Sequence, residues 1–202
     1  EITCRDWSSD VCSSDLSHAR WGNVPKVGLK SLVELRKPSG RFYPKHPMSP
    51  FDLPLLRRAI ALAASARQHG NHPFGALLAD ENGQILLEAE NTVVTESDST
   101  GHAETNLVRL ASRQFSIDRL AKLTLYTSTE PCPMCSGAIF WSGIGRVVYA
   151  LGEERLYAMT GDSPESLKLP CREIFARGGR PVEVLGPLLE TEAARVHDGF
   201  WD

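Results

Sequence analysis

The chain of 202 residues lacks any apolar run long enough to cross a bilayer, and its first residues lack the charged and apolar regions of a secretory signal. A cytoplasmic protein is therefore the expectation. The five cysteines are odd in number and show no disulfide framework in their spacing. The remaining composition, 42% hydrophobic and 23% charged residues, is that of a folded protein with one sizeable core.

Runs of Lys or Arg are also absent, and the formal net charge of -3 is divided unevenly along the chain. Residues 1–50 carry eight Lys and Arg against five Asp and Glu, whereas residues 51–202 carry fourteen against twenty. A protein that grips RNA usually needs a basic stripe for the phosphates. The acidic part therefore favours a small, weakly charged substrate over a nucleic acid.

Composition divides the chain into three segments. Residues 1–16 are rich in Ser and Asp, show no hydrophobic periodicity and resemble translated sequencing-adapter read-through, so we interpret them as an artefactual or disordered leader. Residues 17–50 contain five prolines and scattered basic residues, which predicts a Pro-rich extended arm. A solvated arm is preferred on composition, with a nucleic-acid-binding arm as the alternative. Residues 51–202 form the predicted catalytic domain.

Hydrophobic periodicity predicts alternating helices and strands from Asp52 onward. The expected helices cover residues 52–70, 102–114, 132–141, 171–176 and 190–200. The expected strands cover residues 74–79, 84–89, 123–127, 146–150 and 182–185. The first two strands are joined through Glu81-Asn82-Gly83, which is a hairpin signal. This order predicts an α/β fold, a three-layer α/β/α sandwich with a mixed five-stranded sheet.

Two short motifs carry metal-binding chemistry, His102-Ala103-Glu104 and Pro131-Cys132-Pro133-Met134-Cys135. The x2 spacing lets the start of one helix present the sulfurs of Cys132 and Cys135 to one ion, and a proline suits the entry to such a helix. Together with the imidazole of His102 they supply three ligands to Zn²⁺, which prefers four. One position is left for water, as a catalytic zinc site requires.

Zinc lowers the pKa of a bound water to about 7, so a nearby group must carry the proton that is released. Glu104 lies two residues after His102, close enough to reach such a water without being forced onto the metal. We therefore predict that Glu104 is the general acid and base.

Each motif alone has other interpretations. The two cysteines could form a redox pair, which would be expected near a thioredoxin-like pattern, or a structural zinc site, which needs a fourth Cys or His nearby that this sequence lacks. A zinc-stabilised partner subunit without activity is a further alternative, but it predicts loss of the proton carrier, and Glu104 is intact. The two motifs together favour catalysis.

His-x-Glu followed by Pro-Cys-x-x-Cys is the signature of zinc-dependent base deaminases. From about Phe51 to its end, the chain resembles the cytidine deaminase-like superfamily, in its branch of guanine, cytosine and tRNA adenosine deaminases. Beyond the zinc motifs, the resemblance rests on Pro73-Phe74-Gly75-Ala76, Asn91, Thr100-Gly101 and Leu125-Tyr126-Thr127-Ser128-Thr129-Glu130. It implies a Zn²⁺ cofactor, a homodimer, and hydrolytic deamination of a small-molecule nucleobase.

Within this branch the chain looks closest to bacterial guanine deaminase, because Ala138-Ile139-Phe140-Trp141 ends in the aromatic pair of that form. The expected reaction is conversion of guanine to xanthine and ammonia. Cytosine or a nucleoside is the first alternative, since the same zinc ligands serve pyrimidines. A tRNA adenosine is the second alternative, which the acidic charge balance disfavours.

The resemblance also implies substrate-binding residues. Asn91 would hydrogen-bond the base, with a turn-forming Asn as the alternative. Phe74 would offer a surface for the base to stack on, with a core aromatic as the alternative. The backbone amide of Ala103 would contact a ring carbonyl. Trp141 would border the pocket, or else be a large core residue at a helix end.

Residues 151–168 form the segment in which relatives diverge, and an acidic side chain there would assist proton transfer or read the exocyclic groups of the base. Asp162 is the candidate, with Glu165 as the second choice. The chain ends with two aromatic residues, Phe200 and Trp201, which a frayed tail would rarely carry. They are expected to cover a pocket of the same chain or of a neighbour, with ordinary helix packing as the alternative.

Overall fold

The computed structural model describes residues 48–161, 164 and 166–201. The predicted leader over residues 1–16 lies outside the described residues, as does the predicted arm except for its last three positions. Asp162 and Glu165 lie outside them too. Within the part of the chain that is described, no helix combines the length and the apolar character that crossing a membrane would require.

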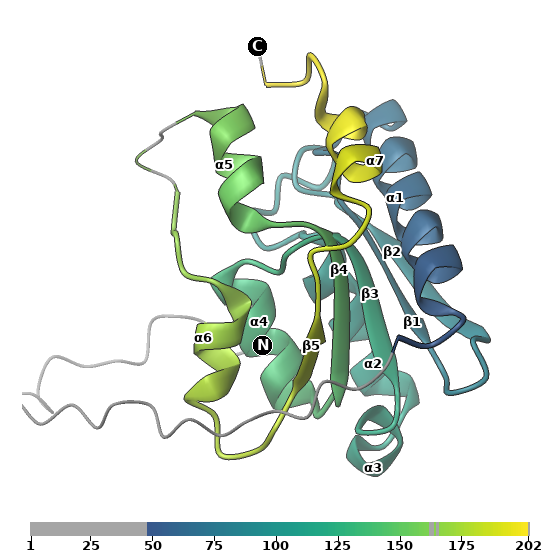
Figure 1. Ribbon diagram of the computed structural model, residues 1–202. Helices are drawn as coiled ribbons and strands as arrows, with labels where there is room; N and C mark the ends of the chain where they lie inside the picture. The colour runs from purple at the N-terminus through teal and green to yellow at the C-terminus, as the bar shows by residue number, and fades with distance from the viewer. Residues whose placement is uncertain (1–47, 162–163, 165, 202) are drawn as a thin grey trace, which may run out of the picture. The chain divides into compact units, whose positions relative to one another are not determined.

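A mixed five-stranded sheet forms the centre of the domain, with strand order β2-β1-β3-β4-β5 (Figure 1). Strand β1 is antiparallel to both β2 and β3, while β3, β4 and β5 run parallel. The strands are β1 (Gly75–Ala79), β2 (Ile85–Glu90), β3 (Thr124–Thr129), β4 (Arg146–Leu151) and β5 (Glu183–Leu185). The predicted sheet is confirmed, including the hairpin that joins β1 to β2.

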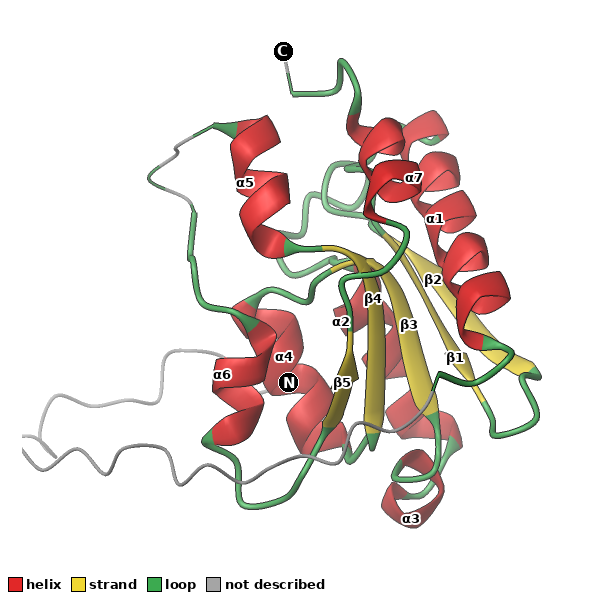
Figure 2. Ribbon diagram, viewed as in Figure 1, coloured by secondary structure: helices red, strands yellow, loops and turns green. Residues whose placement is uncertain are grey.

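Helices cover both faces of this sheet, as Figure 2 shows. One face packs against α1 (Asp52–Gln68) and α7 (Glu190–Ala194), and the other against α2 (Ala103–Gln114), α4 (Pro133–Ser142) and α6 (Cys171–Ala176). Successive strand residues alternate between the two cores, so that Leu77 packs on the α1 side and Leu78 on the α2 side. The predicted three-layer α/β/α sandwich is thus confirmed.

Two helices were not expected from the sequence, α3 (Ile117–Leu120) and α5 (Glu153–Thr160). The second lies within residues 151–168, the segment in which relatives diverge and for which no helix was predicted. Only Leu156 and Met159 of α5 pack against the core on the α1 side, and both are only partly buried. Two core-packing positions in eight residues leave too weak a periodicity to reveal a helix.

The predicted final helix over residues 190–200 is too long. Helix α7 ends at Ala194, a 3₁₀ turn follows over Arg195–His197, and the chain then turns at Gly199, where φ is +63°. A positive φ is accessible to glycine at little cost and ends a helical path. The turn brings the last aromatic residues back toward the body of the domain.

Candidate active site

The three predicted zinc ligands lie together. One ligand atom from each of His102, Cys132 and Cys135 is within 4.8 Å of the other two. The Sγ atoms of both cysteines are 3.6 Å from Nδ1 of His102. An imidazole and two thiols are the donor set of a catalytic zinc site, with a fourth tetrahedral position left over.

Two helix starts produce this cluster. His102 is the N-cap residue of α2, Cys132 is the N-cap residue of α4, and Cys135 follows in the first turn of α4. Pro133 occupies the first helical position of α4, where its fixed φ suits the helix and its missing N–H costs nothing. The hydroxyl of Ser136 donates to the carbonyl of Pro131 at 3.1 Å and closes the turn.

Asn106 holds the loop that precedes α2. Its Nδ2 donates to the carbonyl of Glu90 at 2.9 Å and to the hydroxyl of Thr92 at 3.0 Å. These bonds tie the first turn of α2 to the end of β2, and they set the position of His102. The sequence analysis did not single out Asn106, because a polar residue on a helix carries no local signal for such a contact.

Electrostatics in the cluster favours the ligating form of Cys132. The hydrogen bond from Cys135 lowers the pKa of the Cys132 thiol to about 4, with a further contribution from His102, and these effects outweigh the opposing effect of burial. A thiolate is the form of cysteine that binds a metal ion.

Glu104 is buried beside the cluster, with 5% of its surface exposed. Oε1 accepts a hydrogen bond of 2.7 Å from the hydroxyl of Thr127, and Oε2 accepts one of 3.4 Å from the thiol of Cys135. Burial raises the pKa of the Glu104 carboxyl, as does the nearby charge of Cys132, while the bond from Thr127 opposes the shift. A carboxyl with a raised pKa is suited to exchange protons near neutral pH.

Asn91 and Phe74 lie next to each other, since the backbone N–H of Asn91 donates to the carbonyl of Phe74 at 3.1 Å. Oδ1 of Asn91 accepts a hydrogen bond from the N–H of Val93, two residues on. This is the contact expected of a turn-forming Asn, the alternative interpretation of this residue. Its Nδ2 is buried and has no hydrogen-bond partner among the described residues. The turn therefore uses the oxygen of this amide, and the binding role of Asn91 stays a prediction.

The other predicted substrate residues occupy different environments. Ala103 is the first residue of α2 and fully buried. Phe74 is half-buried and packs both on the α2-side core and on the C-terminal rings. Trp141, near the end of α4, is 82% exposed, so its interpretation as a core residue is wrong. Its place at the border of the pocket stays a prediction, as does the role of Asp162.

The C-terminal segment packs on its own chain. The rings of Phe200 and Trp201 lie 5.9 and 5.7 Å from the ring of His72, measured between centroids. The guanidinium of Arg67, at the end of α1, donates to the carbonyls of Val196 and Asp198. These contacts anchor the segment against the residues that lead into β1.

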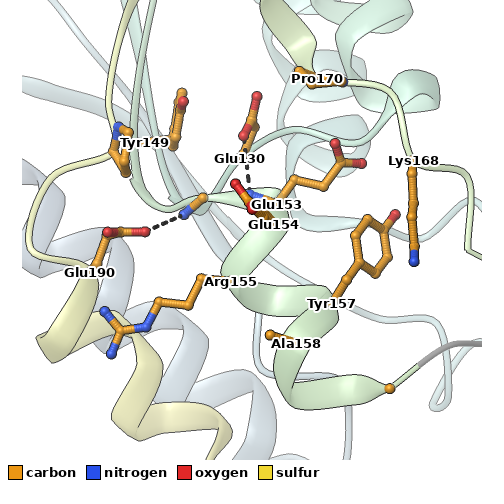
Figure 3. A pocket seen from close by; sticks show the side chains of 13 residues that line it. Glu130, Tyr149, Glu153, Glu154, Arg155, Tyr157, Ala158, Lys168, Pro170 and Glu190 are labelled. Atoms are coloured by element: carbon orange, nitrogen blue, oxygen red, sulfur yellow. Dashed lines mark hydrogen bonds between the residues drawn. The ribbon is translucent and has the colours of Figure 1, made fainter.

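A cavity of about 1140 Å³ lies beside the metal-binding loop, where α5, α6 and α7 begin (Figure 3). Glu130, which directly precedes Pro131, forms part of its wall. Its Oε2 accepts from the N–H of Glu153 at 3.1 Å, and its Oε1 accepts from the N–H of Cys171 at 3.1 Å. One carboxylate thus caps the starts of α5 and α6 and connects both to the loop of Cys132.

Comparisons with known proteins agree with this arrangement. Residues 50–151 match the family model described as the cytidine and deoxycytidylate deaminase zinc-binding region. The chain is 46% identical over 157 residues to a probable cytosine deaminase of Schizosaccharomyces pombe, covering 77% of this chain and 95% of that protein. It is 43% identical over 96 residues to a guanine deaminase of Bacillus subtilis, covering 47% of this chain and 61% of that protein. Relatives described as tRNA-specific adenosine deaminases match as well.

Among solved structures, the fold is similar to that of a guanine deaminase from Nitrosomonas europaea, with a TM-score of 0.61 and 25% sequence identity. The match covers 78% of this chain and 87% of that one.

Proposed function

This chain belongs to the cytidine and deoxycytidylate deaminase zinc-binding family, and from that premise we propose that it removes the amino group of a free nucleobase by hydrolysis. The observation that carries the proposal is the convergence of His102, Cys132 and Cys135 at two helix starts, with the buried carboxyl of Glu104 beside them. These three residues are the proposed zinc ligands. A zinc ion held there would lower the pKa of a bound water and so supply the nucleophile for attack on an amine-bearing carbon.

Glu104 is the proposed proton carrier. Thr127 holds Oε1 of Glu104. Cys135 contacts Oε2, but as a zinc-bound thiolate it would have no proton to donate, so Oε2 would be the oxygen available to exchange a proton. Glu104 takes one proton from the attacking water and passes it to the ring nitrogen. It then takes the second proton, from the hydroxyl left on the attacked carbon, and delivers it to the leaving amine as the carbonyl forms. The carbon–nitrogen bond breaks, ammonia leaves, and the base keeps a carbonyl in place of its amino group.

Two observations support a free base as the substrate. Nδ2 of Asn91 is a buried donor with no partner among the described residues, and it lies next to Phe74, whose ring can stack on a planar heterocycle. The acidic balance of residues 51–202 disfavours the phosphates of a tRNA.

Cytosine is the first substrate we propose and guanine the second. The similarity to the S. pombe cytosine deaminase extends over 95% of that protein, whereas the similarity to the B. subtilis guanine deaminase extends over 61%. The sequence-based expectation of guanine depended on the aromatic pair that ends in Trp141. The 82% exposure of Trp141 weakens that argument but leaves guanine a candidate.

Ammonia release by the zinc-loaded protein tests the proposal, with cytosine, guanine, adenine, their nucleosides and tRNA as substrates. We expect turnover of a free base that Glu104→Ala abolishes. Glu96→Ala, which removes an exposed carboxylate in the loop before α2, is the matched control and should retain activity. Activity on tRNA alone, or an active Glu104→Ala variant, would contradict the proposal.

We also propose that the protein is a homodimer, as the resemblance to the family implies. Helix α4 exposes 82% of Trp141 and 37% of Met134, and exposed apolar surface of this kind marks contact sites. Light scattering should give twice the mass of the chain for the parent protein and a monomer for Trp141→Lys. Leu167→Lys, at a site that is 64% exposed, is the control that should remain dimeric.

A further inference from the structure

His197 is the buried titratable residue that the proposed mechanism does not use. It lies at the end of the 3₁₀ turn after α7 and is 1% exposed. Its ring is stacked on the ring of Trp201, with centroids 6.0 Å apart and an angle of 14° between the planes. On another side it meets the ring of Phe74 at 5.4 Å.

The contact with Trp201 determines which nitrogen of His197 carries the proton. Nε1 of Trp201 lies 3.2 Å from Nδ1 of His197, and an indole nitrogen can only donate. Nδ1 is therefore the acceptor, so the hydrogen of the neutral imidazole is on Nε2. Burial lowers the pKa of His197 to about 4, with a further contribution from the charge of Arg67, and keeps the ring neutral at physiological pH.

The resulting Nε2–H group is a buried donor without an acceptor. Nε2 of His197 has no hydrogen-bond partner among residues 48–161, 164 and 166–201. Buried polar groups in native proteins are nearly always satisfied, and those that are not call for a ligand, an ion or a water. Nδ2 of Asn91 is in the same situation.

Phe74 connects these two unsatisfied donors. Its backbone carbonyl accepts from the N–H of Asn91, and its ring packs against the ring of His197. His72 lies two residues before Phe74 in the same segment. His72 in turn packs against Trp201. The C-terminal residues are thus linked to the proposed base-binding residues by direct contacts.

We propose that His197 binds the substrate, with its Nε2–H donating a hydrogen bond to a carbonyl oxygen or ring nitrogen of the planar base. This inference rests on the proposed function and names a specificity residue for the same site. A planar heterocycle against Phe74 offers acceptor atoms at its edge, and both residues with an unsatisfied donor, Asn91 and His197, contact Phe74. The C-terminal segment then serves recognition as well as packing.

Three substitutions separate the donor from the packing of the segment. His197→Phe keeps a ring of similar size and removes the Nε2–H donor. His197→Gln restores an N–H donor on a flexible side chain. Trp201→Phe removes the bond between indole and imidazole but keeps His197. His69→Phe, at a histidine side chain that is 64% exposed, is the surface control.

The readouts are the KM and kcat for the base that the parent protein deaminates, and the Kd of cytosine and guanine for zinc-loaded protein that also carries Glu104→Ala. Quenching of Trp fluorescence reports the binding. We expect His197→Phe to raise KM and Kd about tenfold, the size of a lost hydrogen bond, with kcat changing less. His197→Gln should recover most of the loss, and Trp201→Phe should have a smaller effect. Zinc content and melting temperature are measured for each variant.

Unchanged KM and Kd in His197→Phe would overturn the inference and leave the proposed function standing. An equal loss in Trp201→Phe would also overturn it, because the effect would then belong to the packing of the C-terminal segment. A parent protein that neither binds nor deaminates any base would overturn the proposed function, and this inference with it.

Discussion

The hydroxyl of Thr127 donates a hydrogen bond of 2.7 Å to Oε1 of Glu104, and it joins strand β3 to the first turn of α2. Thr127 is fully buried, so no water can replace it as the donor. The orientation of the proposed proton carrier therefore depends on a residue of the central sheet. The sequence gives only a weak signal for this contact, because Thr127 is simply a threonine near the end of a strand that leads into the Pro-Cys motif.

Thr127→Val should lower kcat about tenfold, equivalent to about 1.4 kcal/mol, because valine has the shape of threonine without the hydroxyl that holds Glu104. Zinc content should not change. The matched control is Thr129→Val on the same strand, since Oγ1 of Thr129 is buried without a partner among the described residues. Steady-state kinetics checks both variants, and an equal loss in the two would contradict the role of Thr127.

A buried ion pair attaches α1 to the sheet, and its loss should be costly. Arg146 donates to both carboxylate oxygens of Asp52 at 2.8 and 2.9 Å, and the phenol of Tyr126 donates to Oδ1 at 2.8 Å. Asp52→Asn should reduce the free energy of unfolding by about 1–3 kcal/mol, because Arg146 loses its charged partner on α1 while it keeps the ion pair with Glu183. Urea denaturation measures this loss. Glu192→Gln, which breaks the exposed pair with Arg57, should cost about 0–1 kcal/mol.

The stability that Asp52 provides should depend on pH in a defined direction. Burial disfavours the charged carboxylate, but the hydrogen bonds from Arg146, Tyr126 and Ser49 outweigh it, and the folded-state pKa lies below the ordinary value of 3.8. A lowered pKa gives stability that is present above the unfolded pKa and is lost as pH falls through the folded value. The difference between the parent protein and Asp52→Asn should therefore shrink in acid below about pH 4. A difference that grows in acid would contradict this assignment.

The double cap made by Glu130 predicts a graded series. Glu130→Ala leaves the first N–H groups of α5 and α6 without their acceptor and should cost about 1–3 kcal/mol of stability. Glu130→Gln retains one carbonyl oxygen and should cost less. Glu154→Ala, at an exposed position of α5, is the control and should change the melting temperature little. If the Glu130→Ala and Glu130→Gln variants had the same melting temperature as the parent protein, the cap would not be stabilising.

Metal analysis should find one zinc ion per chain. Cys132→Ser and Cys135→Ser should lose the ion and the activity, because a serine hydroxyl is a poor substitute for a thiolate ligand. Cys171→Ala should retain both, since Cys171 lies outside the metal-binding cluster. Treatment with a chelator should abolish activity in the parent protein, and added zinc should restore it. Activity that survives complete removal of zinc would contradict the mechanism.

Much of the fold and of the metal site could be predicted because the signals are local. The apolar spacing after Asp52 reveals α1, and the Glu81-Asn82-Gly83 turn reveals the β1-β2 hairpin. The spacing of Cys132 and Cys135 is that of one helical turn. Helix α5 was not predicted because only two of its apolar residues pack against the core. The last helix was predicted too long because the mixture of polar and apolar residues continues up to the turn at Gly199 and gives no sign of where the helix ends.

The sequence by itself determined which side chains can bind zinc, because the type of each ligand is written in the sequence and the spacing of Cys132 and Cys135 within one helical turn follows from helix geometry. It also determined the order of helices and strands, through hydrophobic periodicity. Only the tertiary structure decided which distant residues meet. It brought Thr127 to Glu104, Arg146 to Asp52, and the C-terminal His197 and Trp201 back to Phe74. Such contacts depend on strand register and on the path of the chain between layers, and no local pattern of residues records either of them.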